Sequence, residues 1–411
     1  MRQGSRAVDS RAPARSRLIP HIDWRGSRDI FRVCLFGILM VNISAIQMYL
    51  GPVRLLRPGL LFLILAIGAL AMRSALGAWK NLNSWVSKAV FIFFVLACCS
   101  GVFGISLGTT GLFIMNVYSR NLLVFFLLIL AIRSTKDLAY MMWAFVISVA
   151  TVVVLAQTVL ELEVTREGLG RLSGGSGLFD ANDLGMILVM ALPIALLFFF
   201  NSQSYTKLVS GLTLIGIPVT VALTGSRGAL LGMVAVGFAI LVSLRRTSVF
   251  KRIAVVVVAA AGLYLGAPEG YWDQMATLLN IKEDYNYSVD YGRKGIAMRG
   301  FGYMLRYPLF GVGSANFGRA EGTISSLAVR RAGEGLSVEW IAPHNTYVQV
   351  GAEMGVPALI IWLSLLGSGT IGLWRLRRRL PKSWDTDSAD RRFLRDACLF
   401  LPISFLGFIV S

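Results

Sequence analysis

Long runs of apolar residues set the strongest limit on what this chain can fold into. The hydrocarbon core of a bilayer is about 30 Å thick, so a helix needs about 20 consecutive apolar residues to cross it. Candidate runs lie at 30–50, 59–72, 89–107, 112–132, 138–160, 184–200, 208–223, 229–244, 253–267, 346–374 and 397–411. Only 15% of the residues are charged, against about 25% in soluble domains. The sequence therefore predicts an all-α, polytopic membrane protein of about 11–12 transmembrane helices.

The last run, 397–411, has 15 residues and is short for a span. We therefore expect the chain as given to stop inside a helix. A hydrophilic region at 268–343 interrupts the apolar pattern. The predicted organisation is a basic tail at 1–29, transmembrane helices at 30–160, a core at 161–375 that includes this loop, and a C-terminal segment at 376–411.

Charged residues are divided unevenly between the two sides of the membrane. With the N-terminus inside, the inner segments hold 26 of the 40 Lys and Arg residues and 8 of the 22 Asp and Glu residues. The net charge of +18 then lies on the inner face, which is the positive-inside pattern. This predicts a cytoplasmic N-terminus and places the loops at 161–182 and 268–343 on the outer side.

The basic tail at 1–29 is interpreted through the same rule. It lacks the apolar core and cleavage site of a signal peptide. Its charge suits orientation and contact with the anionic lipids of the membrane. The aromatic-interleaved surface of a nucleic-acid-binding protein is missing, so no nucleic acid is expected as a partner.

Familiar catalytic and metal-binding motifs are missing from the sequence. Walker A, HExxH, GxSxG and CxxC patterns do not occur. The chain has two histidines, His21 and His344, and its four cysteines lie in or beside apolar runs. We therefore predict no metal site, no cofactor and no disulfide framework.

The first candidate site residue is Arg227, in the turn Thr224-Gly225-Ser226-Arg227-Gly228 between two apolar runs. An arginine at this place can simply extend its head to the membrane surface. Short outer hairpins seldom contain one, however, because of the positive-inside bias. The flanking glycines also allow close approach of a ligand or another backbone, so a functional role is favoured.

The second candidate is Arg293, at the start of a predicted amphipathic helix that runs to Arg306. Ile296, Gly300 and Met304, with Phe301 and Leu305, recur at helical spacing and suit a helix lying on the membrane. The helix start favours anions near Arg293. For Arg299 and Arg306, a functional role and a solvated or headgroup-facing position are equally open.

The third candidate is His344, in Pro343-His344-Asn345-Thr346-Tyr347 just before the run 346–374. A neutral imidazole can accept a proton near pH 7, but a lone histidine is more often structural. Two weaker signals are the helix cap at 180–183 and Arg120. Arg120 is either an intramembrane charge with a function or the sign of a misplaced span boundary.

These motifs occur in a definite order along the chain. They are Gly-Leu-Phe-Asp-Ala-Asn-Asp at 177–183, Thr-Gly-Ser-Arg-Gly at 224–228, Arg293 ahead of Pro308-Leu309-Phe310-Gly311-Val312-Gly313, and Pro-His-Asn-Thr-Tyr at 343–347 with Glu353-Met354-Gly355. The ordered set resembles the O-antigen ligase and polymerase superfamily over roughly residues 175–375. One departure is Ala297, where the family usually has a Trp or another bulky residue.

The resemblance implies a function. Members are glycosyltransferases of the bacterial inner membrane that need no metal and use a glycan on undecaprenyl diphosphate at the periplasmic face. The acceptor is lipid A core, a glycan or a protein. By resemblance, Arg227 and Arg293 bind the diphosphate, which the guanidinium fork suits. His344 is the general base of an inverting transfer.

Two other classes of function fit a multispan chain. A small-solute transporter usually shows repeated halves and polar groups at mid-membrane, whereas the candidate residues here gather at one surface. A structural partner in polysaccharide export would need neither the arginines nor the histidine. The sequence favours the enzyme and leaves ligase and polymerase open.

Overall fold

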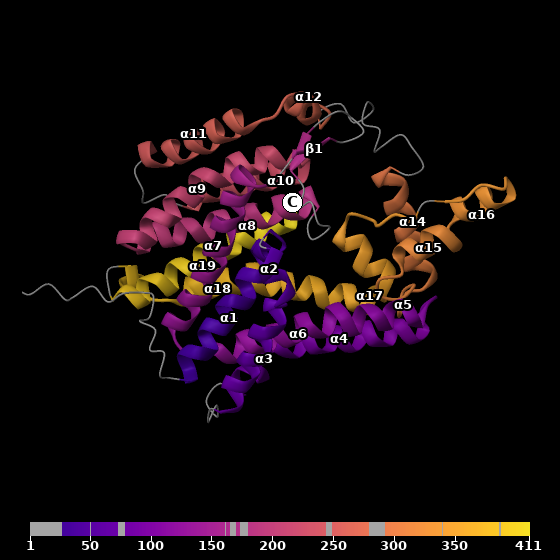
Figure 1. Cartoon of the computed structure of the whole chain (residues 1–411), viewed down its shortest axis with the longest axis horizontal. Coiled ribbons are helices and arrows are strands. Elements are labelled where there is room, and N and C mark those ends of the chain that lie inside the picture. Colours follow the sequence, from indigo (N-terminus) through magenta and orange to yellow (C-terminus); the bar gives the residue numbers. More distant parts are fainter. Residues whose placement is uncertain are drawn as a thin grey trace, which may run out of the picture.

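The protein is an all-α, polytopic membrane protein (Figure 1). The computed structural model describes residues 27–49, 51–72, 79–160, 162–164, 170–172, 180–243, 249–278, 292–338, 340–385 and 388–411. Within these ranges the strands are β1 (Leu162–Val164) and β2 (Gly170–Leu172), which pair antiparallel.

Each predicted apolar run coincides with a helix. The helices are α1 (Ser27–Ser44), α3 (Pro58–Ala71), α4 (Trp85–Phe103), α5 (Leu107–Phe113) continued by α6 (Ser119–Ala131), α7 (Thr135–Thr158), α8 (Ala181–Asn201), α9 (Ser204–Thr224), α10 (Arg227–Ser243), α11 (Val249–Gly266), α17 (Thr346–Gly367) continued by α18 (Leu373–Arg379), and α19 (Ala389–Val410). In the described part of the chain, seven of these are long and apolar enough to cross a membrane. The last is longer than the predicted run, because about two polar turns precede its apolar part and bring it to 22 residues.

Polar residues placed just ahead of the apolar runs begin several helices. Ser84 accepts a hydrogen bond from the Ser87 N–H at the start of α4, and Ser134 does the same for Asp137 at the start of α7. Such caps satisfy backbone donors that a helix leaves without a partner. Asp180 caps α8 in this way, as the sequence predicted.

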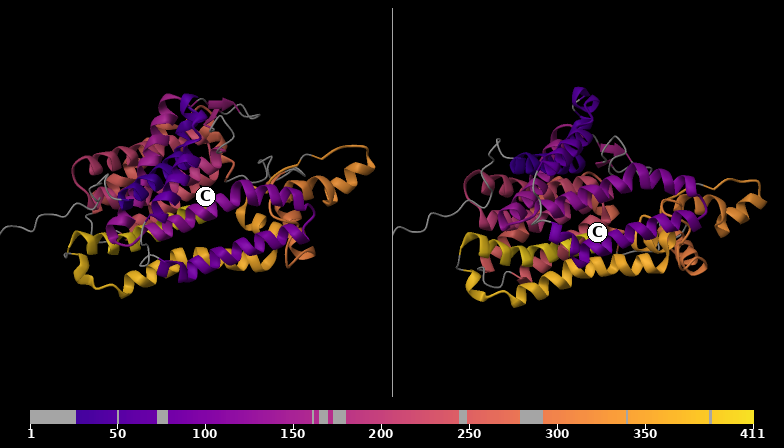
Figure 2. Two further views of the ribbon diagram at one scale, coloured as in Figure 1. Left: turned by 60° about the horizontal axis from the view of Figure 1, so that its bottom comes forward. Right: turned by 90° about the horizontal axis from the view of Figure 1, so that it is seen from below.

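In the described part of the chain, most of the helices pack around two large apolar cores. The larger lies among α7, α8, α9, α10 and α19 and includes Val149, Leu188, Phe198, Val221 and Phe400. The smaller lies among α1, α3, α6 and α7 and includes Phe31, Leu35, Leu63, Leu127 and Tyr140. Figure 2 shows α14 (Arg293–Arg306), α15 (Phe317–Thr323) and α16 (Ser326–Gly333) beyond one end of this bundle. Two smaller apolar clusters of described residues lie at α14–α17 and between α4 and α17.

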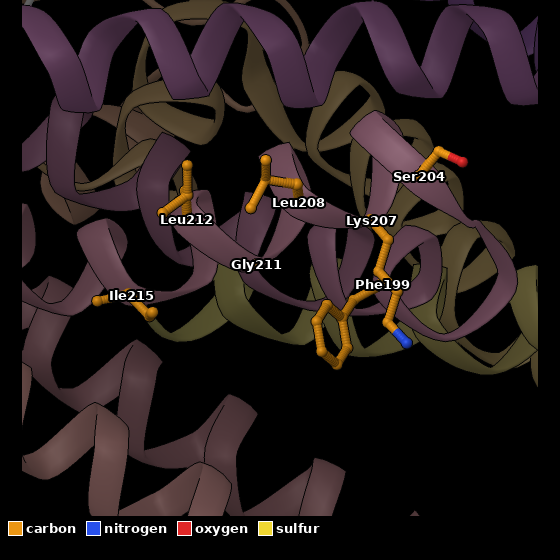
Figure 3. A pocket seen from close by; sticks show the side chains of 7 residues that line it. All are labelled: Phe199, Ser204, Lys207, Leu208, Gly211, Leu212 and Ile215. Carbon is orange, nitrogen blue, oxygen red and sulfur yellow. The ribbon is translucent and has the colours of Figure 1, made fainter.

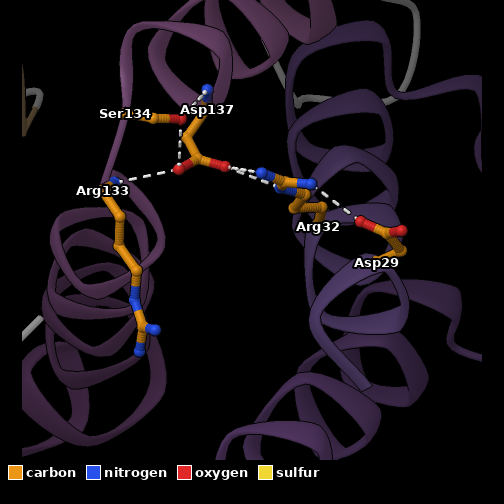
Figure 4. Close-up of polar contacts among 5 residues, drawn as sticks. All are labelled: Asp29, Arg32, Arg133, Ser134 and Asp137. Carbon is orange, nitrogen blue, oxygen red and sulfur yellow. Dashed lines mark hydrogen bonds and ion pairs between the residues drawn. The ribbon is translucent and has the colours of Figure 1, made fainter. Parts of the chain in front are cut away.

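A buried polar cluster joins the start of α1 to the start of α7 (Figure 4). Arg32 donates from Nε to Asp137 Oδ1 at 2.6 Å and from Nη1 to Asp29 at 2.7 Å. The other Asp137 oxygen accepts from the Arg133 N–H at 3.1 Å and the Ser134 hydroxyl at 2.9 Å. Buried charges cost desolvation energy that only complete hydrogen bonding offsets, so the cluster fixes how these two helices meet.

Helix α17 is folded back on itself at Gly355, which corrects the prediction of one uninterrupted span at 346–374. Gly355 has φ 82° and ψ 178°, a conformation essentially restricted to glycine. Tyr347 and Trp362 stand 15 residues apart, about 22 Å in a straight helix, yet their ring centroids are 5.0 Å apart. The first arm, 346–354, therefore doubles back beside the second.

The segment 308–313 lies against the break in α17 and forms backbone hydrogen bonds with residues on both sides of it. The N–H groups of Val312 and Gly313 donate to the carbonyls of Ala352 and Glu353, at 2.8 and 2.9 Å. On the other side of the break, the Val356 N–H donates to the Pro308 carbonyl at 2.8 Å. These bonds satisfy the backbone groups that a broken helix exposes, so the Pro-Leu-Phe-Gly-Val-Gly motif has a structural role here.

The buried Glu353 side chain completes the same joint. Its two carboxylate oxygens accept from the N–H groups of Ala315, at 2.9 Å, and Phe317, at 3.1 Å. Phe317 opens α15, where the helix dipole favours a negative charge. Glu353 therefore ties the unit formed by α14–α16 to α17.

Candidate functional site

Arg227 is held in place at the start of α10. Gly225 takes the left-handed conformation, with φ 56°, and ends α9, and the Ser226 hydroxyl accepts from the Ala229 N–H at 3.3 Å. The half-buried Arg227 donates from Nη1 to Thr277 Oγ1 at 2.8 Å, just after α12 (Tyr271–Ala276). A fixed guanidinium of this kind differs from one that merely reaches for the membrane surface.

A second arginine, Arg171 on β2, holds the same turn and was not singled out from the sequence. Its Nε donates to the Thr224 carbonyl at 2.9 Å, and its Nη2 donates to Asn182 Oδ1 at 3.2 Å. The Ser226 hydroxyl donates to that same amide oxygen at 2.9 Å. The hairpin, the start of α8 and the turn before Arg227 therefore form one polar network.

His344 lies beside the start of α8. It adopts φ 47°, a left-handed conformation that histidine tolerates better than most residues. Its Nδ1 is 3.8 Å from Asp180 Oδ2, and the two side chains are 48% and 44% exposed. Asn345 follows and caps α17 by accepting from the Val348 N–H at 3.1 Å, so His344 stands at a helix start, as predicted.

The end of α19 lies between the histidine motif and the arginine turn. The Tyr347 hydroxyl donates to the Ile409 carbonyl at 3.2 Å. On the other side, a Cβ at Gly228 would collide with the carbonyl oxygen of Ser411. Figure 1 shows the C-terminal end beside α8 and α10. The fold therefore brings the motifs at 180–183, 224–228 and 343–347 to one place.

Arg293 is exposed in the first turn of α14. Among the described residues, no hydrogen bond or ion pair joins it to Arg227 or His344. The helix itself is amphipathic, but one predicted face packs within the protein. A Cβ at Gly300 would meet Val348 and Phe317, and Ile296 is buried.

The side of α14 that remains open carries Met298, Phe301 and Leu305, which are 64%, 49% and 66% exposed. These residues, and not Ile296 and Gly300, are the ones available to a membrane surface. Phe301 and Leu305 of the predicted face are thus open, whereas Ile296, Gly300 and Met304 pack inward, because the first arm of α17 occupies that side.

Arg299 forms a largely buried ion pair, which excludes the solvated or headgroup-facing alternative for this residue. Its Nη2 is 2.6 Å from Glu321 Oε2 on α15, and the Tyr303 hydroxyl donates to Glu321 Oε1 at 2.8 Å. Burial, reinforced by this carboxylate, raises the pKa of Tyr303. Arg306, in contrast, is exposed and lies over the Tyr307 ring.

Arg120 lies inside a continuous helical stretch. The 25 residues from Leu107 to Ala131 form one candidate span that includes a π-helical turn at Ile114–Tyr118.

Two apolar pockets lie away from these polar residues. The larger, about 610 Å³, is formed by α8, α9, α10 and α11 and is lined along α10 by Met233, Val234, Gly237, Phe238 and Leu241. The smaller, about 420 Å³, lies on α8 and α9, where Lys207 stands over the Phe199 ring (Figure 3). Arg227 begins α10, so the larger pocket lies about 9–21 Å further along the same helix.

A comparison with known protein families identifies the part of the chain that contains these residues. The model of the O-antigen ligase family matches residues 211–363. This region belongs to the O-antigen ligase family. It runs from α9 into α17 and contains Arg227, Arg293 and His344, so the resemblance seen in the motifs is confirmed at the level of the superfamily. No curated protein matches the chain.

The family and the fold together define a coarse function. The protein is a multi-pass membrane protein with an O-antigen ligase domain. Its function is of the O-antigen ligase type, in polysaccharide biosynthesis, with a lipid-linked glycan and an acceptor as substrates.

Proposed function

We propose that the protein transfers or polymerises an undecaprenyl-diphosphate-linked glycan at the periplasmic face of the bacterial inner membrane. The acceptor is lipid A core, another glycan or a protein. The observation that carries this proposal is the convergence of the Arg227 turn and His344 at the end of α19. Both lie inside the region that matches the O-antigen ligase family.

In the proposed mechanism, Arg227 and Arg293 bind the diphosphate of the donor. A leaving diphosphate gains negative charge as the sugar–phosphate bond breaks, and guanidinium groups stabilise that charge through paired hydrogen bonds. The described residues bring no three His, Cys, Asp or Glu side chains together as a metal site. In this proposal the arginines take the part that a divalent cation plays in many other enzymes.

His344 acts as the general base. It removes the proton of the acceptor hydroxyl, whose oxygen attacks the anomeric carbon from the face opposite the diphosphate. The bond between that carbon and the phosphate oxygen breaks, its electron pair leaves with the diphosphate, and the configuration inverts. Base catalysis of this kind contributes about 10²–10⁴-fold.

The apolar pocket of about 610 Å³ supports a lipid-linked donor. A diphosphate at Arg227 places the start of its isoprenoid chain at the top of α10. The chain can then follow this helix into the pocket, which α8, α9 and α11 complete with aliphatic and aromatic side chains.

Surface polysaccharide of a deletion strain tests the proposal. If the protein is a ligase, the strain loses glycan on lipopolysaccharide or protein and accumulates long lipid-linked glycan. If it is a polymerase, single lipid-linked repeat units accumulate. Restoration by the intact gene, but not by His344→Ala, assigns the change to this site. Unchanged lipid-linked glycan in the deletion strain contradicts the proposal.

A further inference from the structure

Asp180 faces His344 with one carboxylate oxygen while the other oxygen caps a helix. Oδ1 accepts from the N–H groups of Asn182, at 2.6 Å, and Asp183, at 2.9 Å. Oδ2 is the oxygen that lies 3.8 Å from His344 Nδ1. The capping bonds therefore orient the carboxylate so that its second oxygen is directed at the imidazole.

The backbone around His344 holds the imidazole in this position. Pro343 on one side is buried, and Asn345 on the other caps α17 through Val348. The two ring nitrogens of an imidazole lie on different sides of the ring. With Nδ1 towards Asp180, Nε2 lies on the other side of the ring, and the His344 side chain is 48% exposed.

We propose that Asp180 is a positioning residue for His344: it accepts a hydrogen bond from Nδ1–H and thereby keeps Nε2 unprotonated. The inference rests on the proposed function, in which His344 is the general base. A base oriented by a third group is the recurring arrangement of nucleophile activation. The 3.8 Å separation is longer than a hydrogen bond, as often occurs before substrate binds, and a shift of about 1 Å closes it.

This arrangement determines where the proton and the electron pair go in the transfer step. The proton of the acceptor hydroxyl passes to Nε2 as the new carbon–oxygen bond forms and the diphosphate leaves with its electron pair. Nδ1–H stays bound to Asp180 throughout. The resulting imidazolium is stabilised by the carboxylate, which stays ionised.

Asp183 is the competing carboxylate, because it also interacts electrostatically with His344. It lies one residue further into the first turn of α8 than Asn182, and its own N–H is bound by Asp180. The geometric contact with Nδ1 belongs to Asp180. Asp183→Asn is therefore the matched comparison for Asp180→Asn.

Asp180→Asn is informative because it preserves the helix cap. Asparagine caps as well as aspartate, and its carbonyl oxygen must then face the N–H groups of α8. The amide NH₂ consequently turns to His344 and donates to Nδ1, which moves the imidazole proton to Nε2. The variant should fold like the wild type but hold the histidine in the wrong tautomer.

The tautomer can be measured because the chain has only two histidines. Protein labelled with ¹⁵N-histidine, carrying His21→Gln and purified through a tag without histidine, gives imidazole signals from His344 alone. In lipid nanodiscs we expect the Nδ1–H form in the parent and the Nε2–H form in Asp180→Asn. The same tautomer in both proteins overturns the inference.

Kinetics give an independent test with a lipid-linked donor. Asp180→Asn should lower kcat by about 10- to 100-fold, less than the loss seen for fully buried orienting carboxylates, with donor KM unchanged. In a His344→Ala background it should cause no further loss, because a positioning residue acts only through its base. Glu334→Gln, an exposed site on the turn after α16, is the control and should match the wild type.

The outcomes separate this inference from the function on which it rests. If His344→Ala abolishes turnover but Asp180→Asn does not, the base role stands and the pairing with Asp180 is wrong. Equal loss in Asp183→Asn alone transfers the role to that residue. If His344→Ala retains normal turnover, the base assignment fails and the positioning role fails with it.

Discussion

Arg227 and Arg293 are held by the fold in different ways. Arg227 is half-buried and bonded to Thr277, while Arg293 is exposed at the start of α14. Rigid side chains lose less conformational entropy when a ligand binds than mobile ones do. In the proposed mechanism, Arg227 would therefore provide a preorganised contact to the donor, and Arg293 one that orders on binding.

Arg→Lys at either position should weaken donor binding, because an ammonium group lacks the planar fork that binds two phosphate oxygens. Charge-assisted hydrogen bonds contribute about 1.5–3 kcal/mol, so the Kd of the lipid-linked donor should rise about 10- to 100-fold. The measurement is donor binding to purified protein in nanodiscs. Arg306→Lys, at an exposed arginine over Tyr307, should bind normally. Normal binding by Arg227→Lys would falsify the diphosphate role.

At the level of helices, most of the fold follows from local sequence. Apolar runs of about 20 residues form helices because a membrane leaves the backbone no other partner. Asp180 was predicted as a cap for the same local reason. The fold-back of α17 was not predicted, because it depends on segment 308–313, some 40 residues earlier in the chain. Arg171 was missed because its contacts with Thr224 and Asn182 are tertiary.

Gly355 is the position on which the fold-back of α17 depends. A Cβ there would lie 2.6 Å from the carbonyl oxygen of Pro308, in a backbone conformation open only to glycine. Gly355→Ala should lower the free energy of unfolding by about 1–3 kcal/mol. It should also displace His344, which lies just before the first arm. Turnover should fall with it. Gly367→Ala, at a helical site where a Cβ meets nothing within 4 Å, should leave both quantities unchanged.

The apolar pocket beside α10 allows a test of donor binding in which none of the polar candidate residues is changed. Gly237 lines this pocket, and a Cβ there would meet nothing within 4 Å. Gly237→Phe should fill the space proposed for the isoprenoid chain and raise donor KM with little change in stability. Gly68→Phe on α3, where space is also open, is the matched control. Equal KM in Gly237→Phe and wild type contradicts the proposed path of the lipid.

At the scale of the whole molecule, both ends of the bundle carry basic residues, and the α14–α16 unit holds seven Lys or Arg residues and one Glu between residues 293 and 333. The α14–α16 unit and α18 lie at opposite ends in Figure 1. Basic residues cluster in α18 and in the start of α19, at Arg375, Arg377, Arg378, Arg379, Arg391, Arg392 and Arg395. The segments assigned to the outer side hold 14 basic and 14 acidic residues in total. The positive-inside rule therefore predicts a cytoplasmic α18 end, and the opposite end, with the candidate site, is expected to face the periplasm. A donor whose glycan is assembled into surface polysaccharide is then used on the correct side.

Cysteine labelling in intact cells tests this orientation. The four native cysteines are buried or half-buried and can be replaced by alanine. Thr323→Cys and Ser337→Cys are at exposed positions in the α14–α16 unit and the chain after it, and Ser383→Cys is exposed beyond α18. With the outer membrane permeabilised, an impermeant maleimide should label the first two, and the third only after the inner membrane is disrupted. Because the positive-inside rule concerns insertion and not the fold, the reverse pattern would leave the helix packing intact. It would, however, place Arg227 and His344 on the cytoplasmic side and remove the proposed periplasmic reaction.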